Sequence, residues 1–285
     1  MTLLPAPLVS TQWLAAHCDA PGLVVLDASY HLPAANRDAA ADFAAAHIPG
    51  ARFLDLKTLF DPASPVPYAF PTPEQLAARL AGLGVAPDAA IVIYDDSAIR
   101  SAARAWFVLS ASGWSDVAIL DGGLAKWRSE GRALESGTCD IAPAEPASLA
   151  APSRLRSKAE MLANLDSRAE QVLDARGADR VYGRGLDPVH GMPNGRIPGS
   201  CNLPFGALFN DDGTWTSPDA IRGAFTAAGI DLDAPVTTTC GSGVTASVLL
   251  FAMHLLGKHD TALYDGSWSE WGADPATPKA QGPEA

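Results

Sequence analysis

The sequence of 285 residues predicts an α/β protein made of two tandem copies of one domain, each a parallel sheet with helices on both faces. Three observations predict this fold. The chain carries a weak internal repeat, short apolar runs alternate with helical patterns, and a cysteine ends a β-branched run. The length fits two domains of ordinary size, and an apolar fraction of 48% supplies each with a core.

The repeat consists of four pairs of short motifs that recur in the same order in both halves of the chain. Residues 24–28 match 172–175, 47–51 match 196–200, 91–95 align with 236–240, and 121–127 align with 265–271. A repeat of this length indicates a duplicated domain and excludes a solenoid. In the first copy the patterns predict helices over 74–82 and 101–110, and strands over 89–94 and 117–120.

A stretch rich in Pro, Ala, Ser and Glu separates the two copies and is typical of an extended linker. We therefore expect an N-terminal domain over 1–135, a linker over 136–156 and a C-terminal domain over 157–285.

Charge and cysteine usage narrow the function classes. A net charge of −12 argues against nucleic acid and anionic membranes as partners. The chain has four cysteines, Cys18, Cys139, Cys201 and Cys240. Their spacing matches neither a metal site nor a disulfide framework. We therefore expect no metal or organic cofactor and a protein of the reducing cytoplasm. Neither a signal peptide nor a segment of transmembrane length is expected.

Cys240 is the strongest candidate for chemistry. It follows the β-branched run 236–239, and an apolar segment over 247–256 predicts a helix directly after the loop. Main-chain N–H groups of such a loop converge, and the helix dipole adds positive potential. A cysteine placed there loses its proton easily and becomes a nucleophile.

The residues after Cys240 predict an anion cradle, which is formed by Gly241, Ser242, Gly243, Val244 and Thr245. Gly241 and Gly243 let the loop curl because glycine accepts positive φ. The hydroxyl groups of Ser242 and Thr245 either bond the sulfur or cap the helix. A cysteine-dependent phosphatase is a poor fit because the sixth residue after Cys240 is Ala246, which cannot bind phosphate as arginine does.

The motif Cys-Gly-Ser-Gly-Val-Thr-Ala at 240–246 resembles the loop of two-domain rhodanese-fold sulfurtransferases of the 3-mercaptopyruvate branch. The thiosulfate branch typically carries Arg-Lys at 241–242. Further hallmarks of the family are the motifs at 47–51 and 264–271. The resemblance covers nearly the whole chain up to Asp274, and it implies two rhodanese-like domains.

The resemblance also implies substrate-binding residues. Arg180 aligns with an arginine that binds the donor carboxylate, while Val189 stands where the family has a second arginine. Arg184, His190 and Lys57 are weaker candidates for binding the donor. Many members of the family also have an aspartate and a histidine in the first domain that are proposed to assist the serine at position 242. Here Lys57 and Tyr68 occupy those two places, which argues against a proton relay through Ser242.

Other polar residues have structural interpretations. Asp95 aligns with Cys240 and cannot form a persulfide, so we expect the first domain to be catalytically inert and Asp95 or Asp96 to cap the next helix. Arg176 is expected to form a structural ion pair, and the tryptophans of 268–271 are expected to pack.

The predicted function is transfer of a sulfane sulfur from 3-mercaptopyruvate through a Cys240 persulfide to a thiol, a thioredoxin-like protein or cyanide. Ping-pong kinetics should follow. Three alternatives stay open: thiosulfate as the donor, a persulfide carrier or sensor, and a redox role of Cys240 alone.

Overall fold

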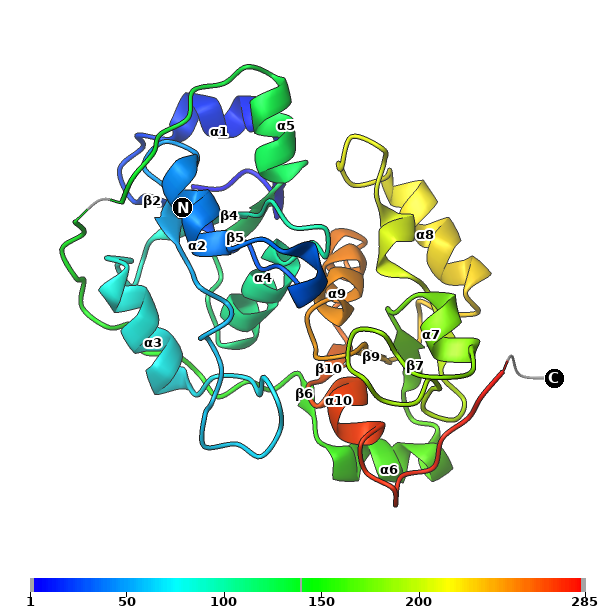
Figure 1. The fold of residues 1–285 in the computed structure, drawn as a ribbon. Helices are drawn as coiled ribbons and strands as arrows, with labels where there is room; N and C mark the ends of the chain where they lie inside the picture. The colour runs from blue at the N-terminus through cyan, green and yellow to red at the C-terminus, as the bar shows by residue number, and fades with distance from the viewer. Residues whose placement is uncertain (1–2, 139, 283–285) are drawn as a thin grey trace. The chain divides into compact units, whose positions relative to one another are not determined.

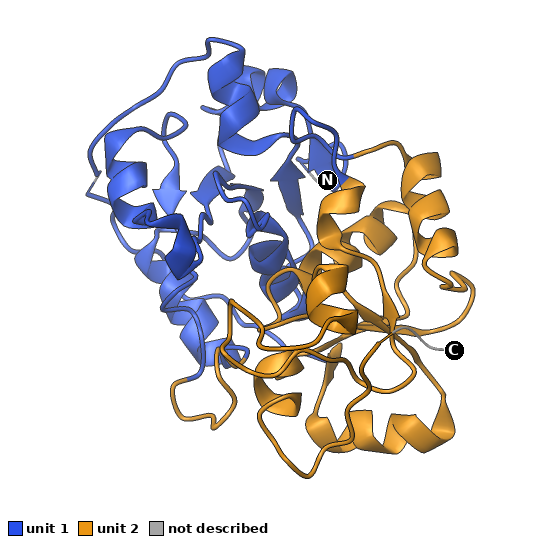
Figure 2. Ribbon diagram, turned by 45° about the vertical axis from the view of Figure 1, so that its right-hand side comes forward, with its two compact units in different colours: residues 1–61, 70–153, 209–215 blue, residues 62–69, 154–208, 216–285 orange. Residues whose placement is uncertain are grey.

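The computed structural model describes residues 3–138 and 140–282, so Cys139 lies outside the described residues. Two compact units are present: residues 1–61, 70–153 and 209–215 form unit 1, and residues 62–69, 154–208 and 216–285 form unit 2 (Figure 2). Each unit therefore includes a short segment from the other half of the chain.

Unit 1 is a five-stranded parallel sheet flanked by helices (Figure 1). Its strands lie in the order β1-β5-β4-β2-β3. Its elements along the chain are β1 (Leu8–Val9), α1 (Thr11–His17), β2 (Leu23–Asp27), η1 (Pro33–Ala35), α2 (Ala39–Ala45), β3 (Arg52–Phe53), α3 (Pro73–Gly82), β4 (Ala90–Tyr94), α4 (Ala102–Ala111), β5 (Val117–Leu120) and α5 (Gly123–Ser129).

Unit 2 repeats this arrangement, with strand order β6-β10-β9-β7-β8 and all pairs parallel. Its elements are β6 (Leu155–Arg156), α6 (Lys158–Ser167), β7 (Gln171–Asp174), α7 (Ala178–Tyr182), β8 (Cys201–Asn202), η2 (Phe205–Leu208), α8 (Pro218–Ala227), β9 (Val236–Thr239), α9 (Ala246–Leu255), β10 (Thr261–Tyr264) and α10 (Ser267–Trp271). Equivalent strands occupy equivalent places in the two sheets, so the duplication and the fold class predicted from the sequence are confirmed.

Local sequence explains where the helices begin. Thr72 and Gln75 form a reciprocal capping box at the start of α3, and Ser157 and Glu160 form another at α6. Helices α4 and α9 are almost entirely buried, which accounts for their apolar sequences. The predicted elements over 74–82, 89–94, 101–110, 117–120 and 247–256 all agree with the structure to within a residue.

Residues 140–153 of the segment predicted as a linker belong to unit 1. Its backbone donates from Ala144 to the carbonyl of Ala81 at 2.9 Å and from Ala150 to the carbonyl of Ser112 at 3.0 Å. These bonds tie it to the ends of α3 and α4. The division of the chain at 136–156 stays a prediction.

Asp95 ends β4 as Cys240 ends β9, and it has a structural role. One carboxylate oxygen accepts from the N–H of Ser97 at 3.0 Å, and the other accepts from the N–H of Ala102 at 2.7 Å. The second bond caps α4, as expected from the sequence. Burial raises the pKa of Asp95 from 3.8 to about 6, although these two N–H groups oppose the shift.

Replacing Asp95 should change how stability depends on pH. A carboxyl whose pKa is raised by folding contributes its stability below its ordinary pKa and loses it as pH rises towards 6. Compared with Asp95→Asn, the wild type should therefore lose about 3 kcal/mol of unfolding free energy between about pH 4 and pH 7. Denaturant unfolding of both proteins measures this difference. A difference that stays constant with pH, or grows towards pH 7, would contradict the assignment.

Candidate active site

Cys240 is buried at the carboxyl end of β9, with 2% of its surface exposed, and the loop 241–245 connects it to α9. In a parallel sheet this is the edge where ligands bind. The strand–loop–helix arrangement predicted from the sequence is therefore present. Gly243 has a φ of +79°, which glycine adopts without strain, whereas Gly241 is not in the positive-φ region, contrary to our expectation.

Gly241 is required for a different reason. A Cβ atom at this position would lie 2.0 Å from Cε1 and 2.6 Å from Nε2 of His190. The imidazole of His190 therefore packs directly on the backbone of the residue after Cys240. No side chain fits at position 241 while His190 lies there.

Helix α10 holds the start of the loop from one side. The carbonyl of Cys240 accepts from the N–H of Trp268 at 3.0 Å, and the carbonyl of Gly241 accepts from both the N–H (2.9 Å) and the hydroxyl (2.7 Å) of Ser269. A trans peptide places its C=O and N–H on opposite sides. The N–H groups of Gly241 and Ser242 therefore face away from α10.

The end of the loop is oriented by α9. The carbonyls of Gly243, Val244 and Thr245 accept bonds from the first residues of that helix, from the Ser247 hydroxyl (2.9 Å), Ser247 N–H (3.2 Å) and Val248 N–H (3.1 Å). The N–H groups of Val244 and Thr245 consequently point off the helix N-terminus. Within the described part of the chain, none of the N–H groups of residues 241–245 has an acceptor. This arrangement suits an anion.

Ser267 links Cys240 to the end of β10. Its hydroxyl donates to the carbonyl of Tyr264 at 2.9 Å and accepts from the N–H of Cys240 at 3.3 Å. Ser267 has a φ of +50°, an uncommon conformation for serine. No role for Ser267 or Ser269 was expected from the sequence, although both lie inside the recurring motif at 265–271. Trp268 and Trp271 are buried, so their predicted packing role is confirmed.

Arg180 lies at the site but is partly engaged. Its Nε and Nη2 atoms donate to the two carboxylate oxygens of Asp187 at 3.0 and 2.7 Å, and Nη2 also contacts Nδ1 of His190 at 3.0 Å. The fork that we expected to hold the donor carboxylate is therefore occupied by Asp187. Nη1 has no acceptor among the described residues and stays available.

Asp187 holds Arg180 and His190 at this corner of the site, although no role for it was expected from the sequence. It is fully buried, and it also accepts from the N–H of Val189 at 2.8 Å. Burial alone would raise the pKa of Asp187, but the hydrogen bonds and charge of Arg180 and the N–H of Val189 hold that pKa well below its ordinary value. Asp187 is thus a carboxylate at neutral pH.

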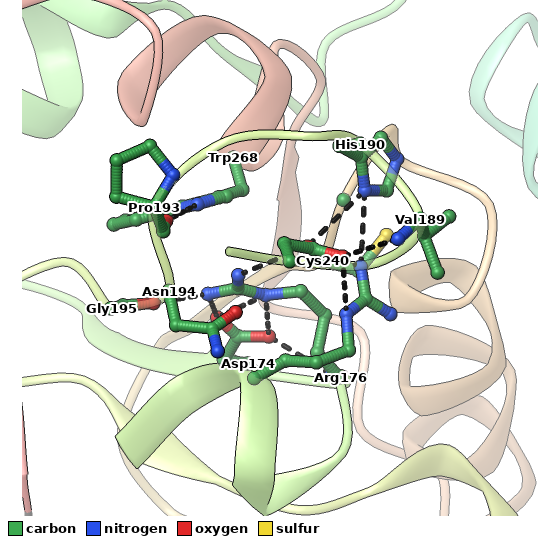
Figure 3. Close-up of polar contacts among 12 residues, drawn as sticks. Asp174, Arg176, Val189, His190, Pro193, Asn194, Gly195, Cys240 and Trp268 are labelled. Atoms are coloured by element: carbon green, nitrogen blue, oxygen red, sulfur yellow. Dashed lines mark hydrogen bonds and ion pairs between the residues drawn. The ribbon is translucent and has the colours of Figure 1, made fainter. Parts of the chain in front are cut away.

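Arg176 forms the structural ion pair expected from the sequence. Its guanidinium binds the carboxylate of Asp174 at 2.6–3.1 Å, donates to the carbonyl of Gly195 at 2.7 Å and lies 4.6 Å from the ring centre of Trp268 (Figure 3). Both charged side chains are almost completely buried. Arg176 therefore has a structural role, and its guanidinium is not available to bind a donor.

The structure also places the other polar residues of the predicted site, together with the nearby Arg196. Arg184 is exposed, and the structure gives its side chain no contact with the cradle. Arg196 is buried, where it donates to the carbonyl of Gly282 and lies over the ring of Tyr182. Lys57 is exposed and belongs to unit 1, whereas Tyr68 belongs to unit 2. Among the weaker candidates in unit 2, His190 packs against the Cys240 loop.

The fold and this site define a class: the chain belongs to the rhodanese-like domain family, whose model matches residues 10–130 and 157–274. It is 40% identical to mouse 3-mercaptopyruvate sulfurtransferase over 93% of this chain and 91% of the relative. It is 37% identical to bovine thiosulfate sulfurtransferase over 96% of this chain and 95% of the relative.

A solved structure agrees. The crystal structure of SseA from Escherichia coli, described as a 3-mercaptopyruvate sulfotransferase with the rhodanese fold, matches with a TM-score of 0.84 and 35% identity, covering 93% of this chain and all of that one. The family resemblance inferred from the sequence is confirmed. Among the described residues, no helix is long and apolar enough to cross a membrane.

The two serines on α10 should differ in importance. Ser269→Ala should cost about 1 kcal/mol of unfolding free energy, because the N–H of residue 269 still binds the carbonyl of Gly241. Ser267→Ala leaves the buried N–H of Cys240 without its acceptor and should cost more than Ser269→Ala, up to about 3 kcal/mol. Denaturant unfolding compares the two variants, and an equal or reversed ranking would contradict this description of the loop.

Proposed function

We propose that this protein is a sulfurtransferase that takes sulfur from 3-mercaptopyruvate, carries it as a persulfide on Cys240, and passes it to a thiol, a thioredoxin-like protein or cyanide. The observation that carries this proposal is the buried Cys240 followed by a loop whose N–H groups lack acceptors among the described residues. A thiolate and a persulfide are both anions, so one cradle of N–H groups stabilises both states.

The reaction has two steps. The thiolate of Cys240 attacks the donor sulfur, an S–S bond forms, and the C–S bond breaks with its electron pair left on the carbon fragment. That fragment is the enolate of pyruvate, which takes a proton from water. The acceptor then attacks the outer sulfur and restores the Cys240 thiolate, so the kinetics should be ping-pong.

Arg180 is the residue we propose for the donor carboxylate. Its charge is shared with Asp187, and Nη1 remains to donate to a substrate oxygen. A single-nitrogen contact holds a carboxylate less rigidly than a bidentate fork would. Nη1 therefore supplies orientation, and the N–H groups of the loop supply most of the positive potential. No resident cofactor is part of this mechanism.

Thiosulfate is the second candidate donor. The chain is almost as similar to the bovine thiosulfate enzyme (37% identity) as to the mouse 3-mercaptopyruvate enzyme (40% identity), which supports thiosulfate as a possible donor. The pair Gly241-Ser242 in the cradle favours 3-mercaptopyruvate. Release of pyruvate and release of sulfite from the respective donors, with cyanide as acceptor, distinguish the two. Faster turnover of thiosulfate would reverse our assignment, and a halt after one turnover with either donor would indicate a persulfide carrier.

We also propose a cytoplasmic location. Among the described residues, Cys18, Cys201 and Cys240 form no disulfide, as is usual in a reducing compartment.

Cys240→Ser should abolish turnover and leave no added sulfur on the peptide that contains residue 240, because a hydroxyl cannot form a persulfide. Cys201→Ser is the matched control, since Cys201 is a partly buried cysteine at the start of β8 in the same unit. That control should keep turnover within about twofold of the wild type. Sulfur found on Cys201, or turnover by the Cys240 variant, would refute the proposal; intact-mass and peptide mass spectrometry provide the measurement.

Arg180→Lys keeps a positive charge beside Asp187 but removes Nη1. With 3-mercaptopyruvate, kcat/KM should fall by roughly 10- to 100-fold, the usual effect of losing one charged hydrogen bond. Arg184→Lys makes the same exchange at an exposed position and should stay within about twofold of the wild type. Steady-state kinetics of both variants provide the measurement, and equal effects at the two positions would exclude the proposed role of Arg180.

A further inference from the structure

His190 has one ring nitrogen whose role is fixed by its neighbours. Nδ1 lies 3.0 Å from Nη2 of Arg180 and 3.3 Å from a carboxylate oxygen of Asp187. A guanidinium can only donate, so the shorter contact requires a lone pair on Nδ1. The longer contact, with Asp187, would be a hydrogen bond only if Nδ1 carried a hydrogen. We assign the hydrogen bond to the shorter contact, in which Nδ1 accepts from Arg180, because Asp187 already holds Arg180 in place.

This assignment determines the other nitrogen. A neutral imidazole carries one hydrogen, and with Nδ1 accepting from Arg180 that hydrogen must be on Nε2. No acceptor for Nε2 is present among the residues that the structure describes. His190 therefore presents an N–H donor without an acceptor in the described part of the chain, and its side chain is 16% exposed.

The ring is also placed at the reacting centre. It packs on Gly241, so closely that a Cβ atom there would overlap Cε1, and Gly241 directly follows the nucleophile. The neighbours that fix the ring are themselves fixed, because Asp187 is fully buried and binds Arg180 through two bonds. A donor held in place before the reaction costs little reorganisation when charge develops near it.

We propose that His190, held by Arg180, donates its Nε2–H to the ketone oxygen of a keto-acid sulfur donor and stabilises the enolate that leaves. This inference rests on the proposed function. When the C–S bond of 3-mercaptopyruvate breaks, its electron pair spreads from carbon onto the ketone oxygen, and the hydrogen bond to that oxygen strengthens. His190 keeps its proton, and the enolate later takes its proton from water.

The same argument makes His190 a determinant of donor preference. Cleavage of thiosulfate releases sulfite, whose charge is spread over three oxygens, and no enolate forms. One N–H donor therefore stabilises the leaving sulfite less than it stabilises an enolate. The contact between His190 and Gly241 also ties the two positions together, because a side chain at 241 displaces the imidazole.

Two isosteric variants separate the catalytic role from a structural one. The amide of His190→Gln reaches the place of Nε2 and can donate there, whereas the amide of His190→Asn lies at the place of Nδ1 and can only keep the bond to Arg180. With 3-mercaptopyruvate, kcat/KM should fall about 100-fold in the Asn variant, the usual cost of losing one oxyanion donor, and about 10-fold or less in the Gln variant. Thiosulfate turnover should change less than about fivefold in both.

Gly241→Ala is a second route to the same result, since its methyl group displaces the ring without altering residue 190. It should lower kcat/KM for 3-mercaptopyruvate more than for thiosulfate. The proposal is overturned if the Asn variant is more active than the Gln variant, or if activity with both donors falls equally. Mass spectrometry of Cys240 in the wild type distinguishes failure of the His190 proposal from failure of the proposed function. If either overturning kinetic result is found but Cys240 still forms a persulfide, only the role of His190 is contradicted. If Cys240 forms no persulfide with either donor, the proposed function is contradicted as well.

Discussion

The hydrogen bonds from α10 to the carbonyls of Cys240 and Gly241 are the constraint on which the site depends. They turn two carbonyls towards α10 and leave the attached N–H groups facing the other way. The first turn of α9 does the same for the end of the loop. Residues from two helices thus determine the direction of a row of backbone dipoles, and the nucleophile needs no general base beside it in order to be stabilised as an anion.

This arrangement matters because the charged side chains nearby largely cancel. Arg176 pairs with Asp174, and Arg180 pairs with Asp187, so two positive and two negative groups lie close together. The chain as a whole carries a net charge of −12. Beyond roughly 10 Å that charge is screened in ordinary salt, so the local dipoles decide whether an anionic donor is accepted. The attraction comes from the backbone, from Nη1 of Arg180, which has no acceptor among the described residues, and from the proposed Nε2–H donor of His190.

Much of the fold could be predicted from the sequence because its signals are local. The repeat, the strand ending at Cys240 and the apolar helix after it follow from patterns of a few residues. The role of Asp187 could not be predicted, because its partners lie on α7 and in the following loop and meet only after folding. From the sequence, glycine at 241 was explained by backbone freedom. The structure shows instead that glycine is required there because the ring of His190, 51 positions earlier in the chain, packs on this residue.

The most direct test of the account is the structure of the protein after reaction with a sulfur donor. The outer sulfur on Cys240 should lie within hydrogen-bond distance, about 3.5–4 Å for sulfur, of several N–H groups of residues 241–245, with the carbonyls of Cys240 and Gly241 still bound to α10. An outer sulfur that points away from these N–H groups, or a loop whose N–H groups have turned to protein acceptors, would contradict it.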